Sequence, residues 1–361
     1  MTTHDPGVAD AGPGVADTDA TPPSSRRRTG AATIRQVAAL AGVSRATASR
    51  VINGGHLVSP EARAAVEAAI AELHFVPNPV ARSLATRRTG SVALVIPEPN
   101  RRVLADPFFA GIVDGLSMAL EEEDLQMVLL VARDALSARK AAHYVTTGHV
   151  DGAVVASHHR DDGLNGTLVD SGLPTVFIGR PLDVTAAHYV DTDNPRGARL
   201  ATEHLVSRGH RRIATIAGPG DMTAGLDRLT GWREAMASAG LPDDAVEYGD
   251  FTAGSGAEAM ARLLDRVPDL DAVFVANDLM ASGALLQILA RGLTVPGDIA
   301  VFGFDDIGVA ESTTPPLSTV AQPLTSMAAR AGHLLASLLR GEQVPSGPVL
   351  FEPRITLRES A

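Results

Sequence analysis

Residues 33–84 read TIRQVAALAGVSRATASRVINGGHLVSPEARAAVEAAIAELHFVPNPVARSL. This stretch contains three helix-sized segments, each with apolar residues on one face and each beginning at a good capping residue. Thr33 precedes a helix expected over residues 34–41, Ser44 precedes a second, and Ser59-Pro60 opens a third. Gly42-Val43 supplies a tight turn between the first two. A helix, a tight turn and a second helix form the motif that presents a recognition helix to the major groove of DNA.

The second of these helices carries the side chains expected to read DNA. Arg45, Ser49 and Asn53 share one face of it, with Ala46 and Arg50 beside them. Arginine is the best guanine reader because its guanidinium bonds both O6 and N7, and a matched pair discriminates by about 1–3 kcal/mol. Any small three-helix bundle also has a polar face, so the pattern alone leaves DNA binding and a purely structural role both open.

The charge of the chain is distributed unevenly. The 361 residues carry 31 basic and 42 acidic side chains, and a net charge of −11 by itself argues against a protein that binds phosphates. Residues 26–90, however, hold ten arginines, including Arg82, Arg87 and Arg88, against three glutamates, for a charge of +7. Residues 1–25 carry −4 and the 271 residues after position 90 carry −14. A basic module followed by an acidic one indicates a nucleic-acid partner.

Composition bounds the class of protein further. With 45% hydrophobic and 20% charged residues the chain is globular, apart from a tail of about 30 residues rich in Gly, Pro and Asp that we expect to be disordered. The absence of cysteine excludes disulfides, thiolate nucleophiles and Cys-type zinc sites. No apolar run is long enough to cross a membrane, and the N-terminus does not read as a secretory signal, so we expect a cytoplasmic protein.

From Ser91 onward, short apolar runs alternate with helical stretches. The expected strands are 91–97, 127–132, 152–157, 174–179, 212–218, 272–277 and 299–304, and the helical stretches include 109–122, 197–208, 229–239, 255–264 and 279–291. Strands of this composition are covered on both faces, and alternating β and α segments predict doubly wound parallel sheets. The fold class is therefore α/β, and 271 residues are enough for two lobes.

Polar residues follow several of the expected strands, which is where open α/β sheets bind ligands. Asn277 and Asp305 directly follow expected strands, whereas Gln322 lies in the segment TVAQP (319–323) and Arg228 precedes an expected helix. These four residues are the polar candidates, and Phe108 and Phe251 are the candidate apolar walls. Amides, carboxylates and a guanidinium together suit a polyhydroxylated ligand, which needs paired donors and acceptors. These residues also have a purely structural explanation. Asn-Asp after a strand, as at Asn277-Asp278, often caps a helix, and Asp-Asp after a strand, as at Asp305-Asp306, often begins a loop.

Residues 33–84 resemble the headpiece and hinge of the lactose-repressor (LacI/GalR) family of bacterial transcription regulators. The resemblance continues through DPFFAGI (106–112), HVDGAVV (149–155), RGHRRIATIAGP (208–219), DRLTGWREAM (227–236), VFVANDLMASGAL (273–285), VPGDIAVFGFDD (295–306) and TPPLSTVAQP (314–323). It implies a three-helix helix-turn-helix headpiece followed by a two-lobed core like a type I periplasmic-binding protein. The implied domains are a tail (1–30), a DNA-binding domain (31–76), a hinge helix and linker (77–90) and a core (91–361). The core would divide into an N-lobe of about 91–190 plus 320–338 and a C-lobe of about 191–318 plus the C-terminal end.

The resemblance also implies roles for individual residues. Arg45 and Ala46 match the family's variable base readers, and Leu84 matches the hinge leucine that wedges into the minor groove. The DNA-binding candidates are Thr33, Ser44, Arg45, Ala46, Thr47, Ser49, Arg50, Asn53, Arg82 and Leu84. The effector-binding candidates are Asp106, Phe108, Arg228, Phe251, Asn277, Asp305 and Gln322. The hinge helix, expected over 80–85, is too short to be stable alone, so we expect it to fold only on DNA in a dimer.

Two departures from the family pattern alter the expected pocket. The loop PEPNRRVLADPFF (97–109) is longer than the family's usual connection and carries Asp106 in place of asparagine. Gly179 stands where many sugar-responding members carry aspartate.

The expected function is that of a transcription regulator, a repressor that binds a palindromic double-stranded operator as a homodimer at the bacterial nucleoid. A mono- or oligosaccharide effector would bind between the lobes, close them and unfold the hinge helices, although one ligand could equally act as a co-repressor. We expect no enzyme activity, cofactor or metal, because no P-loop or nucleophile elbow is present and His158-His159 reads as a pair of solvated loop histidines. The alternatives are a sugar-binding transport component, opposed by the missing signal peptide and the 33–84 module, and an α/β enzyme.

Overall fold

The structure, a computed structural model, describes residues 32–55, 57–76, 88–160, 163–182, 184, 187–345 and 347–361. The chain divides into two compact units, Met1–Asn78 and Pro79–Ala361. The tail expected over 1–30, the hinge helix expected over 80–85 and the DNA-binding candidates Arg82 and Leu84 lie outside the described residues.

The first unit is the expected three-helix bundle, with helices α1 (Ile34–Leu40), α2 (Arg45–Ile52) and α3 (Pro60–Leu73). All three predicted caps are confirmed. The side chains of Thr33, Ser44 and Ser59 each accept a hydrogen bond from a backbone N–H of the first turn. Gly42, with φ of +65°, makes the turn between α1 and α2, a conformation that glycine adopts without steric cost.

A small apolar cluster holds these helices together. It consists of Val37, Ala38, Ala48, Val51, Val66 and Ala69, with partly buried residues such as Ile34, Ile52 and Phe75 packed around it. Each helix contributes its predicted inner face, so the opposite face of α2 is left to solvent.

The second unit contains two α/β lobes, each built on a six-stranded sheet. The N-lobe sheet has the order β11-β5-β4-β3-β1-β2 and all its strand pairs are parallel. Its strands are β1 (Ser91–Ile96), β2 (Gln126–Val131), β3 (Gly152–Ala156), β4 (Thr175–Ile178), β5 (His188–Thr192) and β11 (Val349–Phe351). The register places Leu94 of β1 between Leu129 and Val154 of its two neighbours.

The C-lobe sheet has the order β12-β10-β9-β8-β6-β7. Its strands are β6 (Ile213–Ala217), β7 (Val246–Tyr248), β8 (Ala272–Val275), β9 (Ala300–Asp305), β10 (Ser318–Ala321) and β12 (Arg354–Thr356). The pairs are parallel except for β10 and β12, which run antiparallel.

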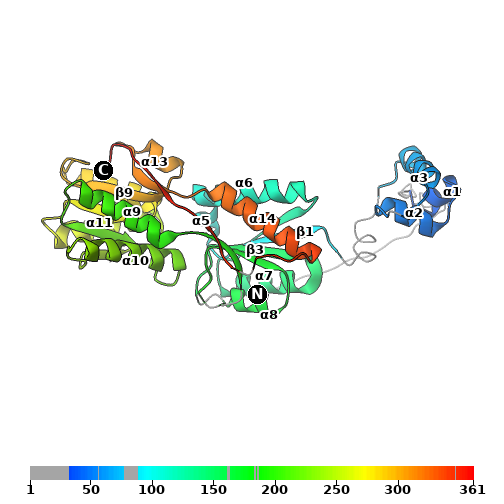
Figure 1. Cartoon of the computed structure of the whole chain (residues 1–361), viewed down its shortest axis with the longest axis horizontal. Coiled ribbons are helices and arrows are strands. Elements are labelled where there is room, and N and C mark those ends of the chain that lie inside the picture. Colours follow the sequence, from blue (N-terminus) through cyan, green and yellow to red (C-terminus); the bar gives the residue numbers. More distant parts are fainter. Residues whose placement is uncertain are drawn as a thin grey trace, which may run out of the picture. The chain divides into compact units, whose positions relative to one another are not determined.

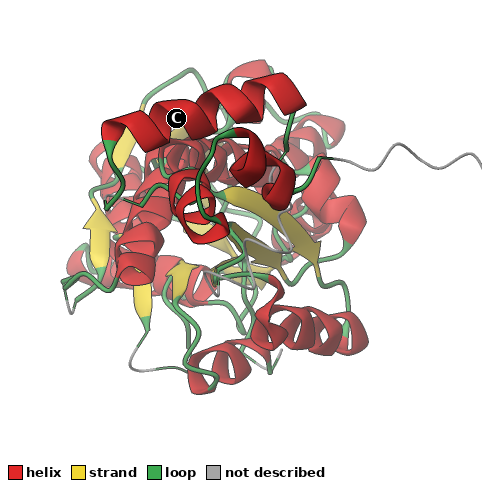
Figure 2. Ribbon diagram, turned by 90° about the vertical axis from the view of Figure 1, so that its right-hand side faces the viewer, coloured by secondary structure: helices red, strands yellow, loops and turns green. Residues whose placement is uncertain are grey.

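Helices cover both faces of the sheets, as the apolar strands predict (Figure 2). Val92, Leu94 and Ile96 of β1 belong to one buried cluster with residues of α6 and α14, whereas Ala93 and Val95 belong to another with residues of α7 and α8. The N-lobe helices are α5 (Asn100–Ala105), α6 (Pro107–Glu122), α7 (Ala135–Tyr144), the π-helical turn η1 (Val145–His149), α8 (Leu164–Asp170) and α14 (Leu324–Arg340). The C-lobe helices are α9 (Asn194–Ser207), α10 (Thr223–Ser238), α11 (Ala253–Arg266), α12 (Asp278–Ala290) and α13 (Gly308–Ser312).

No helix among the described residues has both the length and the hydropathy that crossing a membrane requires.

The chain passes between the two lobes at three places, from β5 to α9, from β10 to α14 and from β11 to β12 (Figure 1). These crossings revise the expected lobe boundaries. Residues 318–321 form a strand of the C-lobe sheet, although 320 and 321 were assigned to the N-lobe. Residues 349–351 of the C-terminal end join the N-lobe sheet instead of the C-lobe, because they pair in parallel with β5.

The seven strands expected from the sequence are confirmed, whereas β5, β7, β10, β11 and β12 were not anticipated. These five strands are short and either partly polar or only partly buried, so they lack the apolar signal of the central strands. The long 97–109 loop also contains an unexpected helix, α5, which leads directly into α6.

Candidate functional site

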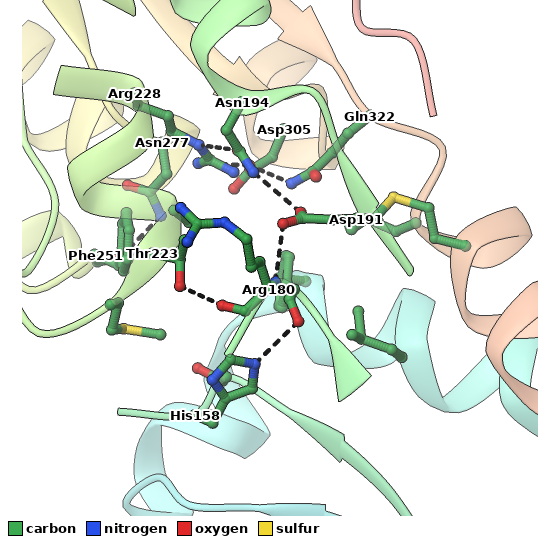
Figure 3. A pocket seen from close by; sticks show the side chains of 18 of the residues that line it. His158, Arg180, Asp191, Asn194, Thr223, Arg228, Phe251, Asn277, Asp305 and Gln322 are labelled. Atoms are coloured by element: carbon green, nitrogen blue, oxygen red, sulfur yellow. Dashed lines mark hydrogen bonds and ion pairs between the residues drawn. The ribbon is translucent and has the colours of Figure 1, made fainter. Parts of the chain in front are cut away.

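A pocket lies between the two lobes, at the carboxyl ends of their strands. It holds about 700 Å³ of empty space, part of it open to solvent. All seven effector-binding candidates line it: Asp106, Phe108, Arg228, Phe251, Asn277, Asp305 and Gln322. Figure 3 shows Arg228, Asp305, Asn194 and Gln322 gathered at one end, with His158 at the other.

The centre of the pocket wall is a buried ion pair. Arg228, on α10, lies with Nη1 3.1 Å from Oδ1 of Asp305, at the end of β9, and each residue is 4% exposed. The same guanidinium donates to the Ala276 carbonyl at 2.5 Å and to Asn194 Oδ1 at 2.8 Å, and it stacks 3.7 Å above the centre of the Phe304 ring. These contacts compensate a charge that is almost fully withdrawn from water.

Burial shifts the pKa values of both members of this ion pair. Loss of hydration raises the pKa of Asp305 to about 6, an effect that the neighbouring Arg228 charge opposes. Burial lowers the pKa of Arg228, while Asp305 and Asp191 oppose that shift. Gln322 donates to the same Asp305 oxygen at 2.6 Å, so Oδ1 accepts two hydrogen bonds.

The backbone around Asp305 is strained. Asp305 has φ of +108° and Asp306 has φ of +56°, in the region that normally favours glycine. Buried Asp278 braces the turn, since it accepts hydrogen bonds from the Ile307 amide at 3.0 Å and from the Thr319 hydroxyl at 2.5 Å. Burial, together with the nearby Asp305 charge, raises the pKa of Asp278 well above its ordinary value. Strain of this kind is common at ligand-binding sites.

Two of the effector-binding candidates, Asn277 and Asp106, also cap helices. Asn277 caps α12 by accepting from the Met280 amide at 2.9 Å, and it donates to the Phe251 carbonyl at 3.1 Å. Asp106 caps α6 by accepting from the Phe108 amide at 3.0 Å, and burial raises its pKa. Both side chains still line the pocket, so capping and ligand contact are compatible here.

Sequence reasoning missed two polar residues of the pocket wall, Asp191 and Asn194. Asp191, at the end of β5, accepts hydrogen bonds from the Arg180 and Thr192 amides and from Asn194 Nδ2 at 3.0 Å. Burial raises the pKa of Asp191 to about 6. Asn194 therefore connects Asp191 to Arg228. The available signal was the run YVDTDN (189–194), in which a carboxylate follows an apolar pair, but β5 itself was not recognised.

The histidine pair is not solvated as expected. His158 is 6% exposed and lines the pocket, where its Nε2 lies 3.2 Å from the Gly179 carbonyl. His159 is held between Glu98 and Asp221. Among the described residues, no group of His, Cys, Asp and Glu is arranged to hold a metal ion.

The described DNA-binding candidates lie along α2 and at the two helix starts. Ser44, Arg45, Ala46, Arg50 and Asn53 are exposed, and Thr47 and Ser49 are half-buried. Thr33 and Ser44 cap their helices. The exposed residues form a polar helix surface opposite the apolar cluster of the bundle.

Comparison with known proteins decides the family. Residues 33–78 match bacterial regulatory proteins of the lacI family, and residues 202–361 match the periplasmic binding protein-like domain. The chain is 49% identical to the HTH-type transcriptional regulator CelR of Thermobifida fusca over 332 residues, which cover 91% of this chain and 98% of CelR. This chain belongs to the lacI family. The lacI-family regulator GalR of Escherichia coli K12 is 33% identical over 91% of this chain and 95% of its own.

Solved structures agree with this assignment. A CelR–cellobiose complex superposes with a TM-score of 0.74 at 48% identity, covering 91% of this chain and 100% of that chain. A lac repressor dimer bound to operator and the anti-inducer ONPF gives a TM-score of 0.79 at 29% identity, covering 91% and 98%. The resemblance, the headpiece and the two-lobed α/β fold expected from the sequence are thus confirmed, and the chain is a DNA-binding transcriptional regulator of the lacI family.

The buried ion pair between Arg228 and Asp305 should contribute to the stability of the fold. Arg228→Met leaves the Asp305 carboxylate buried without its counter-charge, so we expect the free energy of unfolding to fall by about 3 kcal/mol. Denaturant unfolding measures this loss. Arg262→Met is the control, because Arg262 pairs with Glu247 on the surface and its loss should cost below about 1 kcal/mol. Equal losses in the two variants would contradict the account of the pair.

Proposed function

We propose that this regulator binds a neutral sugar of the cellobiose kind between its lobes, and that the sugar changes its affinity for operator DNA. The observation that carries the proposal is the polar network of Arg228, Asp305, Asn194 and Asp191 in the wall of a pocket between the lobes. The 48% identity to a regulator solved in complex with cellobiose supports the choice of ligand.

The chemistry of the pocket suits a sugar. Hydroxyl groups both donate and accept, and the wall offers carboxylate acceptors beside guanidinium and amide donors. Phe108 from the N-lobe and Phe251 from the C-lobe add apolar surface for the faces of pyranose rings. Three carboxylates (Asp106, Asp191 and Asp305) and three arginines (Arg102, Arg180 and Arg228) line the same space, a balance that favours an uncharged ligand.

Helix α14 offers a physical connection from the pocket toward the hinge. Leu324 and Met327, in its first turn, line the pocket. Near its other end, the Leu339 carbonyl accepts a hydrogen bond at 2.7 Å from Arg88, which lies close in sequence to the hinge. A shift of α14 on ligand binding would therefore move Arg88 and the start of the N-lobe, and this movement would carry the signal to the DNA-binding residues.

The DNA contacts are assigned to the headpiece and hinge. Arg45 and Ala46 would read bases, while Ser44, Thr47, Ser49, Arg50 and Asn53 would contact phosphates and bases, with Thr33, Arg82 and Leu84 completing the surface. The core carries −14, so it repels phosphates and leaves DNA contact to the +7 module. We further propose a homodimer on a palindromic operator that acts as a cytoplasmic, nucleoid-associated repressor, with no catalytic step.

Two arginine variants test the recognition helix. Arg45→Ala should change which operator bases are preferred, at a cost of about 1–3 kcal/mol for the cognate site, because a base contact is lost. Arg50→Ala should weaken binding to all sequences more evenly, as expected for a phosphate contact. Selection from a randomised operator library measures both. An unchanged base preference in Arg45→Ala would refute its assignment as a base reader.

A variant of the pocket tests the effector. Asp305→Asn should abolish the release of a fluorescent operator by cellobiose, because the negative charge of the carboxylate that would accept hydrogen bonds from the sugar is lost. The ligand-free variant should still bind the operator. In the wild type, cellobiose affinity should fall as the pH drops through about 6, since Asp305 and Asp191 become protonated there and accept more weakly.

The matched control is Asp265→Asn, a carboxylate exposed on α11 that pairs with Arg291. It should release operator as the wild type does. Normal cellobiose release by Asp305→Asn would show that the pocket is misassigned.

A further inference from the structure

A second polar cluster lies beside the pocket and is centred on Glu98, the second residue after β1. Its carboxylate is 3% exposed. One oxygen, Oε1, accepts from Arg102 Nη1 at 2.7 Å and from the Ser157 hydroxyl at 2.7 Å, and it lies 3.2 Å from His159 Nε2. All four residues belong to the N-lobe.

Two members of this cluster reach the C-lobe. His159 Nδ1 lies 2.8 Å from Oδ2 of Asp221, in the loop before α10, and the Arg160 amide donates to the Asp221 carbonyl at 2.9 Å. The Arg102 guanidinium lies 5.6 Å from the ring centre of Phe251. Glu98 thus fixes two N-lobe side chains that contact the opposite lobe across the cleft.

The geometry specifies the charge of His159. Both of its ring nitrogens face carboxylate oxygens, and an ionised carboxylate only accepts hydrogen bonds. A neutral imidazole carries one proton and would turn a lone pair toward one of the two carboxylates. Only the imidazolium donates from both nitrogens, so the bridge is complete only when His159 is protonated.

We propose that Glu98, His159 and Asp221 form a proton-coupled latch, so that closing the lobes around the effector takes up a proton at His159. The ligand part of this proposal rests on the proposed function, whereas the latch itself depends only on lobe closure. Glu98, His159 and Asp221 do not line the pocket, so they act as positioning residues and not as ligand contacts.

The sign of the coupling follows from the contacts. Hydrogen bonding to Glu98 is the largest cause that raises the pKa of His159, to about 9, with Asp221 adding to it and burial opposing it. Opening the lobes removes Asp221 and weakens the hold on the proton. Proton uptake on closing therefore spans the pH range between the open-state pKa and about 9, and the latch is lost as the pH rises through about 9.

The charged groups around the latch are few among the described residues. Glu98 faces His159 from the loop after β1 and Asp221 from the loop before α10, while Arg102 on α5 acts through Glu98. Arg160 adjoins His159 in the chain, and Asp161 and Asp162, which follow it, lie outside the described residues.

Another ion pair across the cleft provides a contrast. Arg180, after β4, bonds Asp227 of α10 at 2.8 Å. Arginine stays protonated throughout the accessible pH range, so this pair holds the lobes without titrating near neutrality. A pH dependence of closure above neutrality is therefore assigned to His159.

Calorimetry on the full-length protein tests the latch. Cellobiose binding, measured at about pH 8 in buffers of different ionisation enthalpy, should show net proton uptake in the wild type and none in His159→Gln. The ion pair between His159 and Asp221 is partly exposed, so His159→Gln should weaken cellobiose binding by only about threefold at neutral pH. Asp221→Asn should have the same effect. His210→Gln is the matched control, since His210 pairs with Asp271 at 3.6 Å within the C-lobe, and it should retain the uptake.

A second measurement needs no ligand. The sequence has no cysteine, so Lys140→Cys on the N-lobe and Glu258→Cys on the C-lobe, both exposed positions, can carry a fluorophore pair for single-molecule energy transfer. With labelled chains diluted into unlabelled ones, the distance between the lobes should lengthen between about pH 8 and pH 10, and this lengthening should be absent in His159→Gln.

The outcomes separate the two proposals. If cellobiose fails to bind the wild type, the proposed ligand is wrong and the energy-transfer experiment decides the latch. The latch is overturned if His159→Gln keeps the proton uptake, or if its lobe distance responds to pH as the wild type does.

Discussion

The Arg228 guanidinium and the Asp305 carboxylate lie together out of water, where each charge would be costly alone. The rest of the pocket is arranged around this pair. Phe304 stacks beneath the guanidinium, the Ala276 carbonyl and Asn194 take its remaining donors, and Gln322 shares the carboxylate oxygen. The strained backbone at Asp305 is tolerated because these contacts and the Asp278 brace fix it in place.

This network lies next to the segments that join the lobes. Asn194 follows β5 on the first crossing and Gln322 follows β10 on the second. Because Asn194 bonds both Asp191 of the N-lobe and Arg228 of the C-lobe, the relative position of the lobes affects the polar groups that a ligand would meet. Ligand binding and lobe geometry are thus linked through a small set of buried hydrogen bonds. The cluster around Glu98, beside the pocket, adds contacts between the lobes, and one of them passes through His159.

The sequence predicted the parts of the structure that depend on neighbouring residues. The caps at Thr33, Ser44 and Ser59 and the central strands depend on neighbouring residues, and they were placed correctly. The seven predicted effector contacts, from both lobes, all line the pocket, but Asp191 and Asn194 were missed because β5, which leads into them, is short and partly polar. The Glu98, His159 and Asp221 cluster joins three segments far apart in sequence, so no local pattern announces it. Helix α5 was not predicted within the 97–109 loop because it has only six residues and ends directly before Asp106.

The central claim is that a ligand in the pocket and DNA on the headpiece act on one conformational equilibrium. Linkage requires reciprocity, so each ligand must change the binding free energy of the other by the same amount. The most direct measurement is calorimetric titration of cellobiose into the full-length protein, free and saturated with operator DNA. The account predicts that operator raises the cellobiose Kd by the same factor by which cellobiose weakens operator binding. An identical cellobiose Kd in the two titrations would contradict it.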